Sequence, residues 1–143
     1  MLKPAPMPYL ITREDNLLRI TLTGAFTRTD LLELSKAVEQ FESDFGFTPH
    51  RLTDVSEATG PSIKYADILE IVRRFKKRTL ANPIKSAVVA PGILQYGFAR
   101  MYQTLNDHPQ VTVGVFRDLP SALLWVAVDE GEPLAAALPA PSL

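Results

Sequence analysis

Two stretches near the start of the chain, residues 9–13 and 18–23, are rich in apolar and β-branched residues and flank a short polar segment. In the second stretch every other position is apolar: Leu18, Ile20 and Leu22. A period of two is typical of a strand with one face in the core and one in water. The pattern therefore predicts a β-hairpin whose second strand ends at Gly24.

After the predicted hairpin the apolar residues recur at intervals of three and four. Five positions share this spacing: Leu31, Leu34, Val38, Phe41 and Phe45. Such a period places one apolar face along an amphipathic helix. We expect Asp30 to cap the start of this helix, with Glu33 three residues later, and Gly46 to follow its end.

The rest of the chain predicts three further units, each a strand followed by a helix. The strands are expected at residues 51–55, 84–90 and 111–116. Residues 56–61 are rich in turn formers and are expected to form a loop that leads to a helix capped by Ser62. The last helix should begin at Asp118, which Pro120 and Ser121 follow.

The order of predicted elements is β-β-α-β-α-β-α-β-α. Strands that alternate with helices of this length require right-handed crossovers and a mostly parallel sheet. We therefore predict an α/β fold over residues 9–129: a mostly parallel five-stranded sheet with an antiparallel edge strand and helices packed on it. The proline-rich ends, residues 1–8 and 130–143, are predicted to be extended terminal arms.

The composition agrees with one soluble domain of 143 residues, 46% of them hydrophobic. The chain has no cysteine, which excludes disulfides, thiolate metal sites and cysteine nucleophiles. The longest apolar run, Ala122–Val128, is too short to span a membrane, and we expect a cytoplasmic protein. A net charge of −1 gives no general attraction to nucleic acid.

Six short stretches match a known family in the same element order over roughly residues 9–128. They are Leu22-Thr23-Gly24, Thr29-Asp30, Asp54-Val55-Ser56, Ser86-Ala87-Val88-Val89, Ala99-Arg100-Met101-Tyr102 and residues 115–125. With this order the chain resembles the SpoIIAA-like branch of the STAS domains, which includes anti-sigma-factor antagonists. The resemblance implies a non-enzymatic regulatory or binding module that works through the loop after the third strand and the start of the second helix.

In the anti-sigma-factor antagonists this loop carries a phosphorylated serine within an Asp-Ser-Ser/Ala-Gly signature. Here Asp54-Val55-Ser56 matches the residues that lead into the signature, but Thr59-Gly60-Pro61-Ser62 follows. The signature serine has no strict counterpart, so we assign no phosphorylation site to this chain.

The same region is the best candidate binding site on chemical grounds. It leaves the carboxyl end of an inner strand and enters a helix whose free amides can hold an anion. The candidate residues are Asp54, Ser56, Thr59, Gly60, Ser62 and Tyr65. The alternative, which the sequence favours, is that these are ordinary turn and cap residues.

A second cluster of interest is basic and lies at the end of the second predicted helix: Arg73, Arg74, Lys76, Lys77 and Arg78. Such a cluster can bind acidic lipid headgroups, an acidic protein surface or RNA. We favour a solvated helix end whose cations interact with the helix dipole, because no aromatic residues interleave with them.

Catalytic and metal-binding patterns are absent from the sequence. The two histidines, His50 and His108, lie beside prolines in predicted loops, where we expect them to be solvated. No Gly-x-Ser-x-Gly or Gly-Lys-Ser/Thr motif occurs. We predict no enzyme, no metal and no cofactor. An enzymatic interpretation would require Asp54 to face Tyr65 or Arg100 across a pocket.

An apolar stripe marks the third predicted helix: Leu94, Phe98, Met101, Tyr102 and Leu105. The favoured interpretation of this stripe, and of Trp125, is core packing; the alternative is the wall of a ligand pocket.

The leading functional hypothesis is a regulatory or protein-interaction module with a protein partner, with a homodimer kept as an open alternative. The second hypothesis is a carrier of a small apolar ligand or lipid, with its pocket between the sheet and the third helix.

Overall fold

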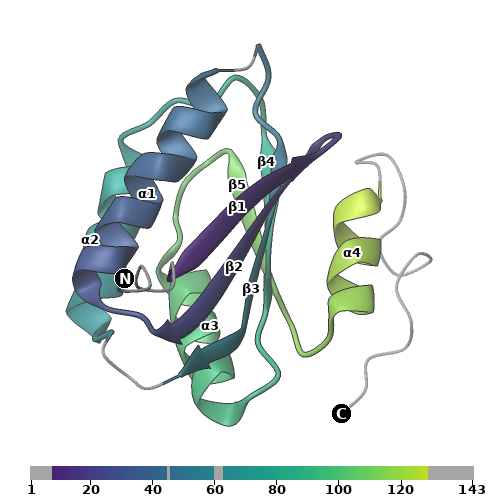
Figure 1. Ribbon diagram of the computed structural model, residues 1–143. Coiled ribbons are helices and arrows are strands. Elements are labelled where there is room, and N and C mark those ends of the chain that lie inside the picture. Colours follow the sequence, from purple (N-terminus) through teal and green to yellow (C-terminus); the bar gives the residue numbers. More distant parts are fainter. Residues whose placement is uncertain (1–7, 45, 60–62, 129–143) are drawn as a thin grey trace, which may run out of the picture.

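In the computed structural model, which describes residues 8–44, 46–59 and 63–128, five strands form one sheet and four helices pack on it (Figure 1). The elements are β1 (Tyr9–Glu14), β2 (Leu17–Ala25), α1 (Arg28–Ser43), β3 (His50–Thr59), α2 (Tyr65–Lys76), β4 (Ile84–Val89), α3 (Ile93–Leu105), β5 (Val111–Phe116) and α4 (Leu119–Ala127). The predicted element order is confirmed. Apart from Pro8, the predicted terminal arms lie outside the described residues.

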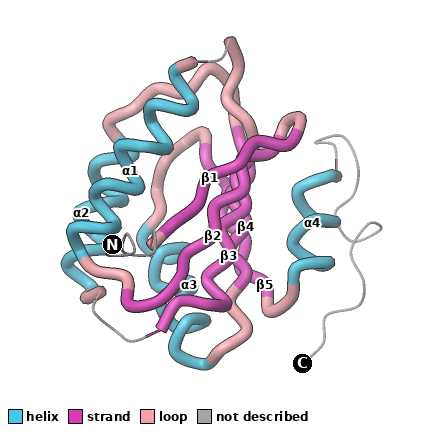
Figure 2. Tube along the Cα trace, in the orientation of Figure 1, coloured by secondary structure: helices cyan, strands magenta, loops and turns pink. Residues whose placement is uncertain are grey.

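The strands lie in the order β1-β2-β3-β4-β5, with β1 antiparallel to β2 and the other neighbours parallel. The mostly parallel sheet with an antiparallel edge is thus confirmed. Because the order never reverses and crossovers are right-handed, the three connecting helices must lie on one face of the sheet. Figures 1 and 2 show α1, α2 and α3 on that face and α4 on the other.

The helix α1 starts earlier than the sequence indicates. Its N-cap is Thr27, whose hydroxyl accepts a hydrogen bond from the Asp30 amide at 3.1 Å, while the Asp30 carboxylate accepts one from the Thr27 amide at 2.9 Å. This is a capping box, so the prediction that Asp30 itself is the cap is wrong. The helix ends at Ser43, before the predicted end next to Gly46.

The strand β3 is longer than predicted. Its last residues pair with Thr23, Gly24 and Ala25 of β2, and an irregularity in the register accommodates one extra residue of β3. The predicted loop at residues 56–61 is therefore wrong for residues 56–59, whereas residues 60–62 lie outside the described residues.

The prediction that Ser62 caps α2 is also wrong. The N-cap of this helix is Lys64, whose backbone amide donates a hydrogen bond to the Asp67 carboxylate at 2.9 Å.

The predicted cap of α4 is correct. Asp118 accepts a hydrogen bond from the Ser121 amide at 2.8 Å, which lowers the pKa of the Asp118 carboxyl.

The face of the sheet under α4 is closely packed. Its buried cluster consists of Leu52, Ala87, Val89, Ala122, Trp125 and Val126. The Trp125 and Phe116 rings lie 5.4 Å apart, which confirms that Trp125 is a core residue. Lys85 donates to the carbonyl oxygen of Trp125 at 2.9 Å and so satisfies the end of α4.

Candidate functional site

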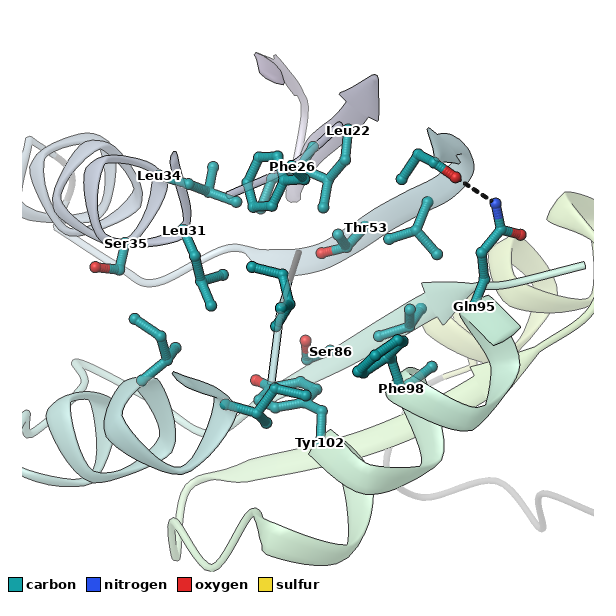
Figure 3. Close-up of a pocket in the computed structure, with 18 of the residues that line it drawn as sticks. Leu22, Phe26, Leu31, Leu34, Ser35, Thr53, Ser86, Gln95, Phe98 and Tyr102 are labelled. Carbon is teal, nitrogen blue, oxygen red and sulfur yellow. Dashed lines mark hydrogen bonds between the residues drawn. The ribbon is translucent and has the colours of Figure 1, made fainter. Parts of the chain in front are cut away.

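The opposite face of the sheet is not filled. A cavity of about 230 Å³ lies between β2, β3 and β4 on one side and α1, α2 and α3 on the other. Figure 3 shows Leu22, Phe26, Leu31, Leu34 and Phe98 around it. The polar residues among its lining are Ser35, Arg51, Thr53, Ser86, Gln95 and Tyr102. The walls are therefore predominantly apolar.

The cavity exists because the middle of the sheet carries small side chains beneath the helices. Thr53 of β3 and Ser86 of β4 face it, and Figure 3 shows both pointing toward its interior. On α3, Ala99 is a further small lining residue. Larger side chains at these three positions would close the space between the sheet and α3.

The cavity reaches the surface at the start of α3. Leu94 lines it and is 54% exposed. Gln95 holds this end of α3 against β3: its side-chain amide donates to the carbonyl oxygens of Ser56 at 3.1 Å and Ala58 at 2.8 Å, and its oxygen accepts from the Gly92 amide at 3.0 Å. Figure 3 shows the Gln95 side chain at the rim.

A buried ion pair stands at the other end of the cavity. Arg51 is 4% exposed and Glu42 is 5% exposed. Nε and Nη2 of Arg51 donate to the two Glu42 carboxylate oxygens at 2.8 and 2.9 Å, and Nη1 of Arg78 donates to the same carboxylate at 2.8 Å. Glu42 therefore joins α1 to β3 and to the segment after α2.

Burial disfavours the charged form of Arg51, but the Glu42 carboxylate outweighs this effect, and the pKa of Arg51 lies above its ordinary value. The Tyr102 hydroxyl acts in the same direction. The Arg51 guanidinium also stacks over the Phe75 ring, 5.0 Å from its centroid.

This pair is not among the residues predicted from the sequence, although the sequence contains a signal for it. Glu42 follows Val38 by four residues and so lies on the apolar face of the predicted helix, and Arg51 opens a predicted core strand. Two charged residues of opposite sign at predicted core positions indicate a buried ion pair.

The structure describes four of the six residues proposed as a binding site. Asp54, Ser56 and Thr59 lie on β3, and Tyr65 is the exposed first residue of α2. The Asp54 carboxylate accepts a hydrogen bond from the Ser56 amide at 2.9 Å. None of these four residues lines the cavity between the sheet and α1–α3. Gly60 and Ser62 lie outside the described residues.

The basic cluster is largely paired with acidic residues. Arg74 forms an ion pair with Glu39, Lys76 with Asp107 and Arg78 with Glu42. The hydrogen bond from Lys76 lowers the pKa of Asp107. Arg73 and Lys77 are exposed. Three of the five basic side chains therefore form ion pairs within the protein.

The prediction that both histidines are solvated is wrong. His108 is buried; its Nδ1 accepts from the Gln110 amide at 3.0 Å, so Nε2 is the protonated nitrogen that donates to the Arg78 carbonyl oxygen at 2.7 Å. Nδ1 of His50 accepts from the Lys85 amide at 2.9 Å. Both rings thus fix backbone segments.

Within residues 8–44, 46–59 and 63–128 no group of three or more histidine, aspartate or glutamate side chains could hold a metal ion. In the same part of the chain no helix has the length and apolar character needed to cross a membrane.

Comparison with known proteins defines the fold. No protein-family model and no curated protein matches the chain. A solved structure of an uncharacterized DUF3478-family protein from Shewanella loihica PV-4, described as having a SpoIIAA-like fold, is similar to it. The similarity has a TM-score of 0.57 at 21% identity and covers 83% of this chain and 92% of the other. The chain therefore has a SpoIIAA-like fold, as its sequence indicated.

The buried pair leads to a stability prediction. Glu42→Gln leaves two guanidiniums without a carboxylate, and we expect the free energy of unfolding to fall by about 3–5 kcal/mol. Glu39→Gln, which breaks the more exposed pair with Arg74, should cost no more than about 1 kcal/mol. Urea unfolding of both variants measures the difference, and equal losses would contradict the assigned role of Glu42.

Proposed function

We propose that this protein is a non-enzymatic binding module with a SpoIIAA-like fold that holds a small apolar ligand between its sheet and α1–α3. The observation that carries the proposal is the apolar cavity of about 230 Å³ that opens beside Leu94. Concave, mostly apolar sites with a few polar groups are typical of small-molecule binding. Three residues of the α3 stripe, Leu94, Phe98 and Tyr102, line it.

The energetic cost of leaving this cavity empty supports the proposal. Apolar walls that face such a space lack the contacts and the burial that neighbouring atoms would provide, and burial is worth about 25 cal/mol per Å² of apolar surface. A domain of this kind is stable by only about 5–15 kcal/mol in total. A ligand that fills the space recovers the lost contacts and stabilises the fold.

The size of the cavity limits the ligand. A core cavity of about 150 Å³ binds benzene, with its six carbon atoms. By proportion, about 230 Å³ holds roughly nine non-hydrogen atoms. The occupant is therefore a medium-chain or single-ring compound, because a whole membrane lipid is several times larger.

Filling the cavity with protein should abolish binding. Ala99→Leu adds three carbon atoms to the cavity wall, and we expect the affinity for octanol, measured by isothermal titration calorimetry, to fall by roughly tenfold or more. The melting temperature should not fall, because the added atoms occupy empty space. Ala66→Leu, at an exposed position of α2, is the matched control. Unchanged octanol binding by Ala99→Leu would place the site elsewhere.

A second observation favours a regulatory protein-interaction role in the cytoplasm as the second candidate. A shallow depression is lined by Ser56, Ala58, Pro91, Gly92, Ile93, Leu94 and Gln95. Ile93 is 89% exposed there, next to the exposed Leu94. Neighbouring exposed apolar side chains at a depression support a contact with a protein partner or a second copy of the chain. Of the predicted site residues, Ser56 belongs to this surface.

This second candidate has its own test. Ile93→Asp should weaken binding of a partner isolated with the wild-type chain by roughly tenfold or more, because a charge replaces the most exposed apolar contact. Leu124→Asp, at an exposed position of α4 on the other face of the sheet, should leave the affinity unchanged. Biolayer interferometry with purified components measures both, and equal affinities for the two variants would refute the role of this surface.

A further inference from the structure

The polar groups of the cavity are concentrated at the end that is distant from its mouth. Arg51 and Ser86 are register partners on the adjacent strands β3 and β4, and both line the cavity. Tyr102 of α3 lines it as well, and Figure 3 shows its side chain close to Ser86. Two helical turns separate Tyr102 from Leu94 at the mouth, a distance of about 12 Å along the helix axis.

This end carries an excess of one positive charge. Arg51 and Arg78 share the single carboxylate of Glu42. The carboxylates of Glu39 and Asp107 form ion pairs with other cations, Arg74 and Lys76. Among the described residues, Glu42 is the one carboxylate in an ion pair with Arg51 or Arg78.

The buried guanidinium has hydrogen-bonding capacity left for a ligand. It carries five N–H donors; its bonds to Glu42 come from Nε and Nη2, and a further donor bonds the Tyr102 hydroxyl, which leaves donors for a ligand. The hydroxyls of Ser86 and Tyr102 add two groups that can donate to an anion. In the low-dielectric interior an excess charge attracts a counter-ion more strongly than it does in water.

We propose that the ligand is a medium-chain carboxylic acid of about eight carbons that binds with its carboxylate at Arg51, Ser86 and Tyr102 and its tail toward Leu94. This inference rests on the proposed ligand-binding function and adds the head group and the orientation. A monoanion matches one excess positive charge, whereas a phosphate monoester carries about −1.5 to −2 at neutral pH and would leave buried negative charge uncompensated.

The test compares ligands that differ only in the head group. Isothermal titration calorimetry of the full chain with octanoate, octanol and octylamine should give an affinity for octanoate roughly tenfold or more above that for octanol, with octylamine weakest. Equal affinities for octanoate and octanol would overturn the carboxylate assignment and leave the apolar site in place. Absence of binding by all three would overturn the proposed function together with this inference.

Two variants separate charge from packing. Arg78→Gln removes the excess charge, keeps the Arg51–Glu42 pair and does not touch the cavity wall, so octanoate affinity should fall by roughly tenfold with octanol affinity unchanged. Tyr102→Phe removes a head-group hydroxyl without changing charge and should act in the same direction, by roughly threefold or more. Arg74→Gln is the control and should change neither affinity. An octanoate-to-octanol ratio that is identical in wild type and both variants would overturn the inference.

Discussion

One buried carboxylate, that of Glu42, holds the helical layer to the sheet. It accepts hydrogen bonds from Arg51 on β3 and from Arg78 after α2, while Glu42 itself belongs to α1. Three segments that are distant in sequence thus meet at one charge, and removal of this carboxylate would leave the buried guanidinium of Arg51 without its partner. At the opposite end Gln95 attaches the start of α3 to the end of β3. Between these two polar attachments the helices span a space that no side chain fills.

The two faces of the sheet consequently differ in packing, and we propose that they differ in function as well. Under α4 the cluster around Trp125 is close-packed, and Lys85 fixes the end of the helix. Under α1, α2 and α3 the sheet presents Thr53 and Ser86, which are too small to reach the helices above them. A fold stabilised on one face can tolerate an open cavity on the other, because the energetic deficit is recovered when a ligand fills it.

Local signals in the sequence were sufficient to predict the elements and their order. The alternation of apolar and polar residues around Ile20 and the helical spacing of apolar residues around Val38 are properties of neighbouring residues, and the strand order follows from the handedness of crossovers.

Features that depend on residues distant in the sequence were not predictable in this way. β3 runs on to Thr59 because β2 pairs with its last residues, and His108 can be buried because the Arg78 carbonyl oxygen accepts a hydrogen bond from its ring. Periodicity likewise does not distinguish a stripe that packs from one that lines a cavity, so Phe98 and Tyr102 could be assigned to the wall only with the structure.

The central claim is that the space between the sheet and α1–α3 is a ligand site. Native mass spectrometry of the full 143-residue chain, purified without denaturant, tests it most directly. The account predicts one bound molecule on the order of 150 Da per chain, released by denaturation and replaced when octanoate is added in excess. The mass of the bare chain alone, both as purified and with excess octanol or octanoate present, would contradict the account.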